Sequence, residues 1–207
     1  MARAIWWSLW PLARMLTLVF PTRYVRRGRL PKGPFVAAIN HLSHLDPPLA
    51  CVGVIRPTRM LALDELWGNS RILDGLFRTF GVIALPREGR RPIAAVRAAL
   101  RELEAGNTVG VFPEGRRVER WGDVELKRGA AWLSVRSGAL LVPMAVWGTQ
   151  HAMSLDSMRL RRARVEIVVC EALNPADFAH ESDPVGALTE ALRVSIDREI
   201  TRMCEPP

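Results

Sequence analysis

Short apolar runs that alternate with longer segments of helical periodicity limit most strongly how this chain can fold. The runs with the length and composition of buried strands are those at 34–39, 59–63, 82–85, 108–112, 140–147 and 164–170. The segments with helical spacing or helix-start signals are those at 46–55, 70–80, 91–105, 127–136 and from 184 onward. This alternation predicts a single α/β domain with a mainly parallel or mixed central sheet that helices flank.

Two details of this pattern concern single elements. The segment at 91–105 gives the clearest helix signal, because four apolar residues recur at helical spacing: Ile93, Val96, Leu100 and Leu103. The strand at 140–147 contains Pro143, which cannot donate a backbone hydrogen bond. We therefore expect this strand to lie at an edge of the sheet or to carry a bulge.

The net charge of +8 is concentrated at the front of the chain. Residues 1–60 hold nine of the 29 Lys and Arg side chains and one of the 21 acidic ones, so the other 147 residues are neutral. A length of 207 residues with 49% apolar and 24% charged residues is typical of a globular domain and excludes a mostly disordered chain. The neutral body argues against a nucleic-acid binder, because such proteins carry a basic face over the fold.

The first 33 residues combine apolar, aromatic and basic side chains. The apolar stretch at 4–20 is interrupted by Pro11 and Arg14, so it is too short to cross a bilayer. It contains three tryptophans, Trp6, Trp7 and Trp10, and is followed by five cations, Arg23, Arg26, Arg27, Arg29 and Lys32. Residues 1–33 are therefore predicted to form an interfacial helical segment on an anionic membrane, ahead of a catalytic domain at 34–207. A helix packed on the core of a soluble protein is the alternative.

His41 and Asp46 form the first candidate catalytic pair. His41 follows a predicted strand and Asp46 begins a helix that Pro47 initiates, so the loop can bring the carboxylate to one imidazole nitrogen. The other nitrogen then serves as a base, unless the histidine is purely structural. The absence of a Gly-x-Ser-x-Gly motif favours direct deprotonation of a substrate hydroxyl. His44 lies three residues from His41, but no further ligand set accompanies them, so no metal site is predicted.

A second constellation follows the strand at 108–112, in the sequence Pro113-Glu114-Gly115-Arg116-Arg117. Gly115 permits close approach of the backbone, and the neighbouring arginines can bind a phosphate. Glu114 is expected to hold these arginines in place. An ordinary surface turn with an ion pair is the alternative interpretation.

Five sequence blocks between Pro34 and Trp147 resemble the glycerolipid acyltransferase family of the lysophosphatidic acid acyltransferase type. The blocks are Asn40-His41-x-Ser43-x-x-Asp46, the stretch 80–87, Phe112-Pro113-Glu114-Gly115-x-Arg117, Leu126-Lys127-Arg128-Gly129-Ala130 and Leu141-Val142-Pro143-Met144. They occur in the family's order and cover more than half of the chain.

This resemblance implies transfer of a fatty acyl group from acyl-CoA or acyl carrier protein to a lysophospholipid hydroxyl, foremost that of 1-acyl-glycerol 3-phosphate. It implies that His41 is the general base, that Asp46 orients it, and that neither a metal nor an organic cofactor is required. The acceptor-binding residues that it implies are Arg87, Glu114, Gly115, Arg116, Arg117 and Lys127.

Three departures from the family pattern concern the acceptor. Arg116 replaces a usual threonine, Leu42 replaces a usual polar residue, and Leu85-Pro86 before Arg87 replaces a more polar pair. Another lysolipid acceptor therefore stays open, as does a non-catalytic membrane-binding protein on the same fold. Three cysteines without metal or redox spacing favour a reducing compartment. The protein is accordingly expected on the cytoplasmic face of the cell membrane, as a peripheral or monotopic protein.

One basic run, at 159–164, has no counterpart in these blocks. It contains four arginines with a single leucine and alanine, and it precedes a predicted strand. We interpret it as a solvated turn, with a secondary lipid or phosphate contact as the alternative.

Overall fold

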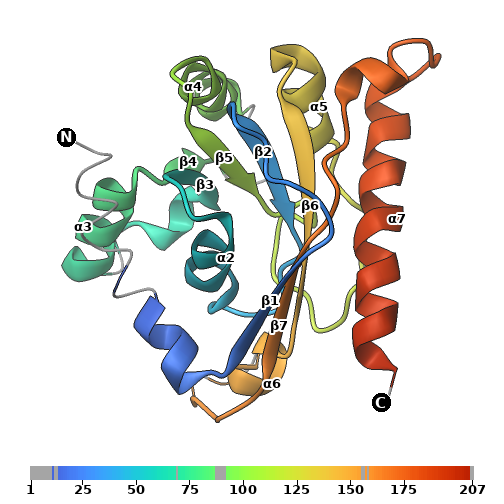
Figure 1. Ribbon diagram of the computed structural model, residues 1–207. Helices are drawn as coiled ribbons and strands as arrows, with labels where there is room; N and C mark the ends of the chain where they lie inside the picture. The colour runs from blue at the N-terminus through green and yellow to red at the C-terminus, as the bar shows by residue number, and fades with distance from the viewer. Residues whose placement is uncertain are drawn as a thin grey trace.

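The computed structural model describes residues 11, 14–68, 70–86, 92–154, 157 and 159–205, and its core is a seven-stranded sheet (Figure 1). The strands are β1 (Thr22–Arg26), β2 (Phe35–Ile39), β3 (Thr58–Leu63), β4 (Ile83–Leu85), β5 (Thr108–Val111), β6 (Leu140–Trp147) and β7 (Val165–Val169). The α-helices are α2 (Asp46–Val54), α3 (Arg71–Phe80), α4 (Ile93–Glu104), α5 (Gly129–Ser137), α6 (Thr149–Ala152) and α7 (Pro184–Cys204). Two short 3₁₀ helices are η1 (Asp64–Leu66) and η2 (Pro175–Phe178).

The sheet is mixed, with the strand order β1-β7-β6-β2-β5-β3-β4. Five of the six neighbouring pairs are parallel, and only β6 and β7 run antiparallel. This confirms the predicted mixed α/β sheet. The carboxyl ends of β2, β5 and β6 meet at one edge, which we call the carboxyl edge; ligands of open α/β sheets bind beyond such an edge.

Helices cover both faces of the sheet. Helices α4, α5 and α7 pack on one face, and α2 packs on the other (Figure 1). All five residues of β2 are buried, as expected for a central strand between two helical layers. Helix α7 buries four apolar residues that recur at helical spacing: Leu188, Leu192, Ile196 and Ile200.

Helix α4 has the predicted helical structure, and small residues make up most of its buried face. Ala95, Ala99 and Leu103 are the buried residues of this helix, whereas Ile93 is 49% exposed. The small side chains of Ala95 and Ala99 let the helix backbone lie close to the layer beneath it. The larger Val96 is only partly buried and packs against the outside of the core.

Strand β6 lies inside the sheet, so of the two alternatives predicted for Pro143 the edge strand is wrong. The other alternative, a bulge, agrees with the pairing: Met144 lies opposite Val169 but Leu141 lies opposite Leu173, so the β7 side has one extra residue there. Pro143 pairs with Ala38 of β2, and its carbonyl accepts a hydrogen bond from the backbone N–H of Cys170. In a strand, the N and C=O of one residue face the same neighbour. The missing N–H therefore faces the β7 side, where the ladder ends at Val169, and an interior proline is tolerated there.

The domain boundary predicted after residue 33 also needs correction. Strand β1 pairs in register with β7, from Thr22 opposite Val165 onward, and Phe20 is buried in the core. The catalytic domain thus includes the chain from residue 20. The tryptophans at 6, 7 and 10 lie outside the described residues, so the interfacial segment stays a prediction. Among the described residues, no helix has the length and apolar character needed to cross a membrane.

Candidate active site

The site begins where β2 ends at the carboxyl edge. Asn40, the next residue, is fully buried and binds the backbone of Val146 in β6 twice. Its side-chain oxygen accepts from the Val146 N–H at 2.6 Å, and its amide group donates to the Val146 carbonyl at 2.9 Å. The side chain therefore ties two strands together at the point where the ladder stops, and it fixes where His41 leaves the sheet.

His41 and Asp46 form a hydrogen-bonded pair. The distance from His41 Nδ1 to Asp46 Oδ2 is 2.9 Å, and the same oxygen accepts the backbone N–H groups of Leu42 and Ser43 at 2.7 Å each. Asp46 is fully buried in the first turn of α2, where the helix dipole favours a carboxylate. With its proton on Nδ1, the imidazole presents Nε2 as a base, and 15% of the side chain is exposed.

Ser43 anchors the loop between this pair. Its hydroxyl donates to the carbonyl of Met153 at 2.8 Å and accepts the N–H of Leu45 at 3.3 Å. Met153 directly follows α6. The loop between His41 and Asp46 is therefore connected to the segment that comes after β6.

The segment after β5 packs against His41. The Phe112 ring stacks on the imidazole, with 3.9 Å between ring centroids and an interplanar angle of 18°. The Val118 N–H donates to the His41 carbonyl at 2.9 Å, and Glu114 Oε1 accepts the His41 N–H at 2.9 Å. His41 is thus held at its ring, its carbonyl and its N–H by one turn.

Glu114 does not hold the arginines that follow it. The side chain is buried, its Oε1 binds the His41 N–H, and its Oε2 meets no donor among the described residues. Burial raises the pKa of Glu114 to about 7, because the charged form is poorly solvated there. The expected ion pair is therefore replaced by a contact that positions the backbone of His41.

Besides Glu114, further predicted acceptor-binding residues lie at this turn. Gly115 has a φ of +71°, and a side chain there would come within 2.7 Å of the Lys127 side chain, so Lys127 crosses over the glycine. The Lys127 N–H also donates to the Pro113 carbonyl at 2.7 Å. Arg117 is half-buried and lies near His44, whose pKa is lowered by burial and by this guanidinium group.

Arg116 and Arg87 complete the predicted set. Arg116 is exposed beside the same turn. Arg87 lies outside the described residues. Within the described ranges, no cluster of three His, Cys, Asp or Glu side chains could hold a metal ion.

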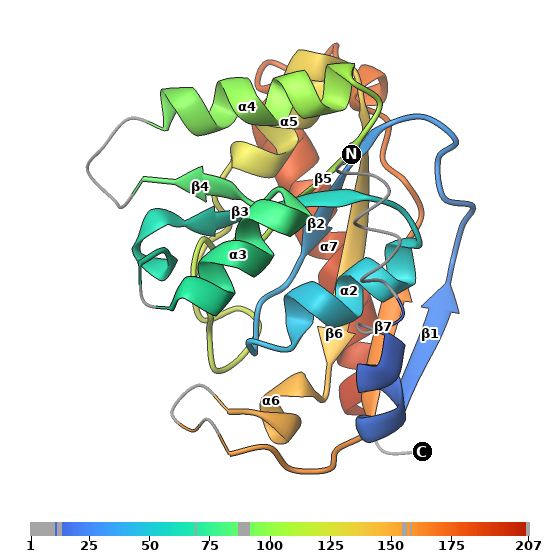
Figure 2. The ribbon, with the colours of Figure 1, turned by 90° about the vertical axis from the view of Figure 1, so that its left-hand side faces the viewer.

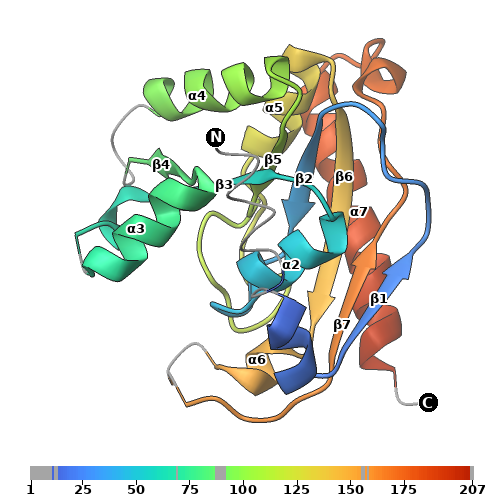
Figure 3. The ribbon, with the colours of Figure 1, turned by 60° about the vertical axis from the view of Figure 1, so that its left-hand side comes forward.

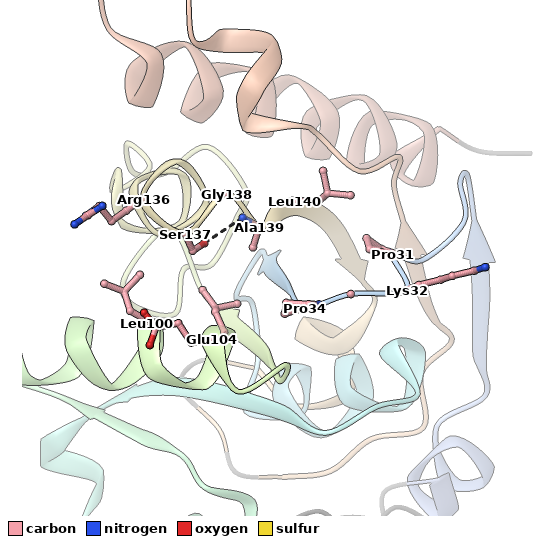
Figure 4. Close-up of a pocket in the computed structure, with 12 residues that line it drawn as sticks. Pro31, Lys32, Pro34, Leu100, Glu104, Arg136, Ser137, Gly138, Ala139 and Leu140 are labelled. Carbon is pink, nitrogen blue, oxygen red and sulfur yellow. Dashed lines mark hydrogen bonds between the residues drawn. The ribbon is translucent and has the colours of Figure 1, made fainter.

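A cavity of about 550 Å³ lies away from these residues (Figure 4). Pro34 and Leu140, which adjoin the starts of β2 and β6, line it together with Arg136. Because β2 and β6 are parallel, their starts lie at the edge opposite the carboxyl edge. The cavity is therefore separate from the His41–Asp46 pair.

Comparison with known proteins identifies the group of enzymes to which this chain belongs. Residues 21–147, more than half of the chain, match the family described as Acyltransferase. The chain belongs to the acyltransferase family. This match begins at residue 21 and so includes β1, in agreement with the corrected boundary.

Named relatives of this acyltransferase come from bacteria. The 1-acyl-sn-glycerol-3-phosphate acyltransferase of Bacillus subtilis is 30% identical over 165 residues, which are 78% of this chain and 79% of the relative. The enzyme of the same name from Borreliella burgdorferi is 27% identical over 114 residues, 54% of this chain and 45% of the relative. The crystal structure of the 1-acyl-sn-glycerophosphate acyltransferase PlsC from Thermotoga maritima has the same fold, with a TM-score of 0.80 at 21% identity. The match covers 97% of this chain and 80% of the Thermotoga maritima chain.

Sequence reasoning overlooked how the acyltransferase site is supported. Asn40, Ser43 and Phe112 were part of the motifs, but the bonds from Asn40 to β6 and from Ser43 to Met153, and the stacking of Phe112, join segments far apart in the chain. The position of Asn40 directly after a buried strand was the available signal, since a buried amide there needs partners.

Proposed function

We propose that this acyltransferase moves a fatty acyl group from a thioester to the free hydroxyl of 1-acyl-glycerol 3-phosphate and so forms phosphatidic acid. The observation that carries the proposal is the 2.9 Å contact between His41 and the fully buried Asp46. The names of the bacterial relatives support the choice of acceptor. The thioester is acyl-CoA or an acyl group carried by acyl carrier protein. No metal or organic cofactor takes part.

In the proposed reaction, Nε2 of His41 removes the proton of the acceptor hydroxyl as its oxygen attacks the thioester carbonyl. Asp46 keeps the other proton on Nδ1 and stabilises the imidazolium that forms. The tetrahedral intermediate then collapses, the carbon–sulfur bond breaks, and the thiolate takes the proton back from His41. The products are the new ester and a free thiol, so no group stays on the enzyme.

The acceptor phosphate is proposed to bind at the turn around Gly115. Lys127 crosses this glycine and Arg117 lies beside it, so two cations stand at this turn. A phosphate is favoured at such a place by charge. We assign Arg87 to the same phosphate from the sequence resemblance.

The acyltransferase is proposed to work on the cytoplasmic face of the cell membrane, where residues 1–33 contact anionic lipid. Residues of this range that the structure describes include Leu18 and Met15, which are 78% and 59% exposed. Apolar side chains at such exposure, next to basic ones, suit the boundary between headgroups and acyl chains. Only the part before residue 20 is proposed to act as a separate anchor.

Arg116 favours a second candidate acceptor. An exposed arginine in place of the family's threonine adds a third cation to the turn. A lysolipid with a larger or more anionic headgroup would use this additional charge.

Product analysis by mass spectrometry separates these candidates. The purified chain is offered a panel of lysolipids with acyl-CoA and with acyl carrier protein donors. We expect phosphatidic acid as the main product from 1-acyl-glycerol 3-phosphate, and none with His41→Ala. Preference for another lysolipid would replace the proposed acceptor. Full turnover by the His41→Ala variant would refute the mechanism.

A further inference from the structure

Residues 159–164, which we call the arginine strap, are exposed and have no role in the site described above. The strap is an irregular segment between α6 and β7. Its four arginines and one leucine are exposed, and Leu160 is 60% exposed. Ala163 alone packs partly against the core. The strap is thus fixed to the protein by one side chain and presents the others to the surroundings.

Topology places the strap at the carboxyl edge, beside the catalytic loop. Strand β7 runs antiparallel to β6, so the segment that enters β7 lies where β6 ends. Figures 1, 2 and 3 show the strap, α6 and the helical stretch at 14–19 at the same end of the sheet. The N–H of Arg161 donates to the carbonyl of Ala152, and the next carbonyl, of Met153, binds the Ser43 hydroxyl.

The charges of the strap are unbalanced. None of its four guanidinium groups makes a hydrogen bond or ion pair with another residue that the structure describes. Arginines of β1 and the residue after it are paired instead. Arg23 lies 3.6 Å from Glu166, which also binds Arg202, and Arg27 lies 2.8 Å from Glu199. Positive charge at the strap therefore stays available to a partner.

Exposed apolar side chains lie beside this charge. Pro21, just after the stretch at 14–19, accepts the backbone N–H of Val165, just after the strap. Leu18, Val19 and Met15 of that stretch are 78%, 57% and 59% exposed. A surface that joins unpaired arginines to exposed leucines suits an anionic lipid layer, which solvates the cations at its headgroups and the apolar groups just below them.

We propose that the arginine strap is a second membrane-contact segment, which binds anionic phospholipid headgroups and turns the carboxyl edge toward the bilayer. This rests on the proposed membrane location of the enzyme. The bond from Arg161 to Ala152 and the adjacent one from Met153 to Ser43 place this contact beside the His41 loop. The strap therefore orients the catalytic pair toward the surface that holds the lysolipid, whereas an N-terminal anchor alone would only tether it.

The test compares two matched variants of the full chain. The strap variant is Leu160→Ser/Arg161→Gln/Arg162→Gln. The control is Arg101→Gln/Val135→Ser/Arg136→Gln, which removes the same charge and one exposed apolar side chain at the far ends of α4 and α5, opposite the carboxyl edge. Thermal unfolding followed by circular dichroism verifies that both variants are folded.

Binding is measured by co-sedimentation with vesicles that contain phosphatidylglycerol and with vesicles of phosphatidylcholine alone. Each cation contributes about fivefold to partitioning onto an anionic surface, so we expect about 25-fold weaker binding of the strap variant to the anionic vesicles. The control variant should bind them like the wild-type chain. Added salt should narrow the difference between the strap variant and the wild type, since it screens the arginines.

Three results would overturn the proposal. Equal vesicle binding by the strap variant and the wild type would refute the role of the strap but not the membrane location of the enzyme. A wild-type chain that binds no vesicle would refute both. Normal vesicle binding by the strap variant, with loss of transfer only from acyl carrier protein, would show that the strap binds an acidic protein instead.

Discussion

Replacing Glu114 with Gln is predicted to stabilise the fold at neutral and alkaline pH and to change its stability little in mild acid. Glu114 is 3% exposed, and its Oε1 accepts the His41 N–H at 2.9 Å. Gln keeps a carbonyl oxygen for this bond but cannot ionise. The variant therefore removes the cost of a buried charge without leaving the His41 N–H unpaired.

The magnitude follows from the pKa of Glu114, which burial raises from 4.5 to about 7. Between these values the folded protein binds more protons than the unfolded chain, so its stability falls as the pH rises through this window. The full loss is about 3 kcal/mol, since each pH unit of difference corresponds to about 1.4 kcal/mol. Below the window Glu114 is neutral in both states and the loss disappears. The variant should avoid this loss and gain about 3 kcal/mol over the wild type at about pH 8.

Urea unfolding of both proteins across the pH range measures this difference. Other titrating groups cancel in the comparison, because they are common to both chains. Glu119→Gln is the matched control: it removes a carboxylate from an exposed residue of the same loop, and it should not show the gain expected of Glu114→Gln. The reasoning is wrong if the Glu114→Gln difference is flat between about pH 5 and pH 8, or if the variant loses stability as the pH rises.

Three further substitutions test other parts of the site and fold. Asp46→Asn should lower kcat by about 1,000-fold, because it disturbs the orientation and charge that His41 needs; near-normal turnover in a steady-state assay would contradict this. Asn40→Ala leaves two buried backbone groups of Val146 unpaired and should lower the free energy of unfolding in urea by about 2–4 kcal/mol; a change as small as that of an exposed residue would count against it. Ile55→Gly should raise the free energy of unfolding by about 1 kcal/mol, because Ile55 ends α2 with a φ of 54° that costs a β-branched residue energy. A lower unfolding temperature in calorimetry would show that its partly buried side chain matters more.

Local signals predicted the contact between His41 and Asp46 well. His41 and Asp46 lie five residues apart in one strand–loop–helix unit, and a helix start with two prolines fixes where the carboxylate stands. The contact between Glu114 and the His41 N–H was not predictable in this way. It depends on the register that sets Ala38 of β2 beside Val111 of β5, which no local pattern contains. Charge alone suggested the arginines as partners of Glu114. In the fold the side chain is buried and accepts the His41 N–H instead.

The first strand was misjudged for a related physical reason. Strand β1 carries arginines at its second and last positions, so its sequence is as compatible with a basic membrane flank as with a strand. Arg23 is neutralised by Glu166, and Arg27, just after the strand, by Glu199, more than 140 residues away in both cases. Such distant partners cannot be read from the sequence around β1, and they remove part of the charge that suggested a membrane contact there.

The single antiparallel pair in the sheet decides which segments reach the site. In a fully parallel sheet, β1 and β7 would begin at the edge opposite His41, and the residues before them would lie far from the catalytic loop. Because β7 runs against β6 and β1 runs along β7, both strands begin at the carboxyl edge. The exposed stretch at 14–19 and the arginine strap therefore stand beside α6 and the Ser43 loop (Figures 2 and 3). A membrane-binding segment at either place is connected to the His41 loop by a few hydrogen bonds. A fully parallel arrangement of the same elements could not provide this connection.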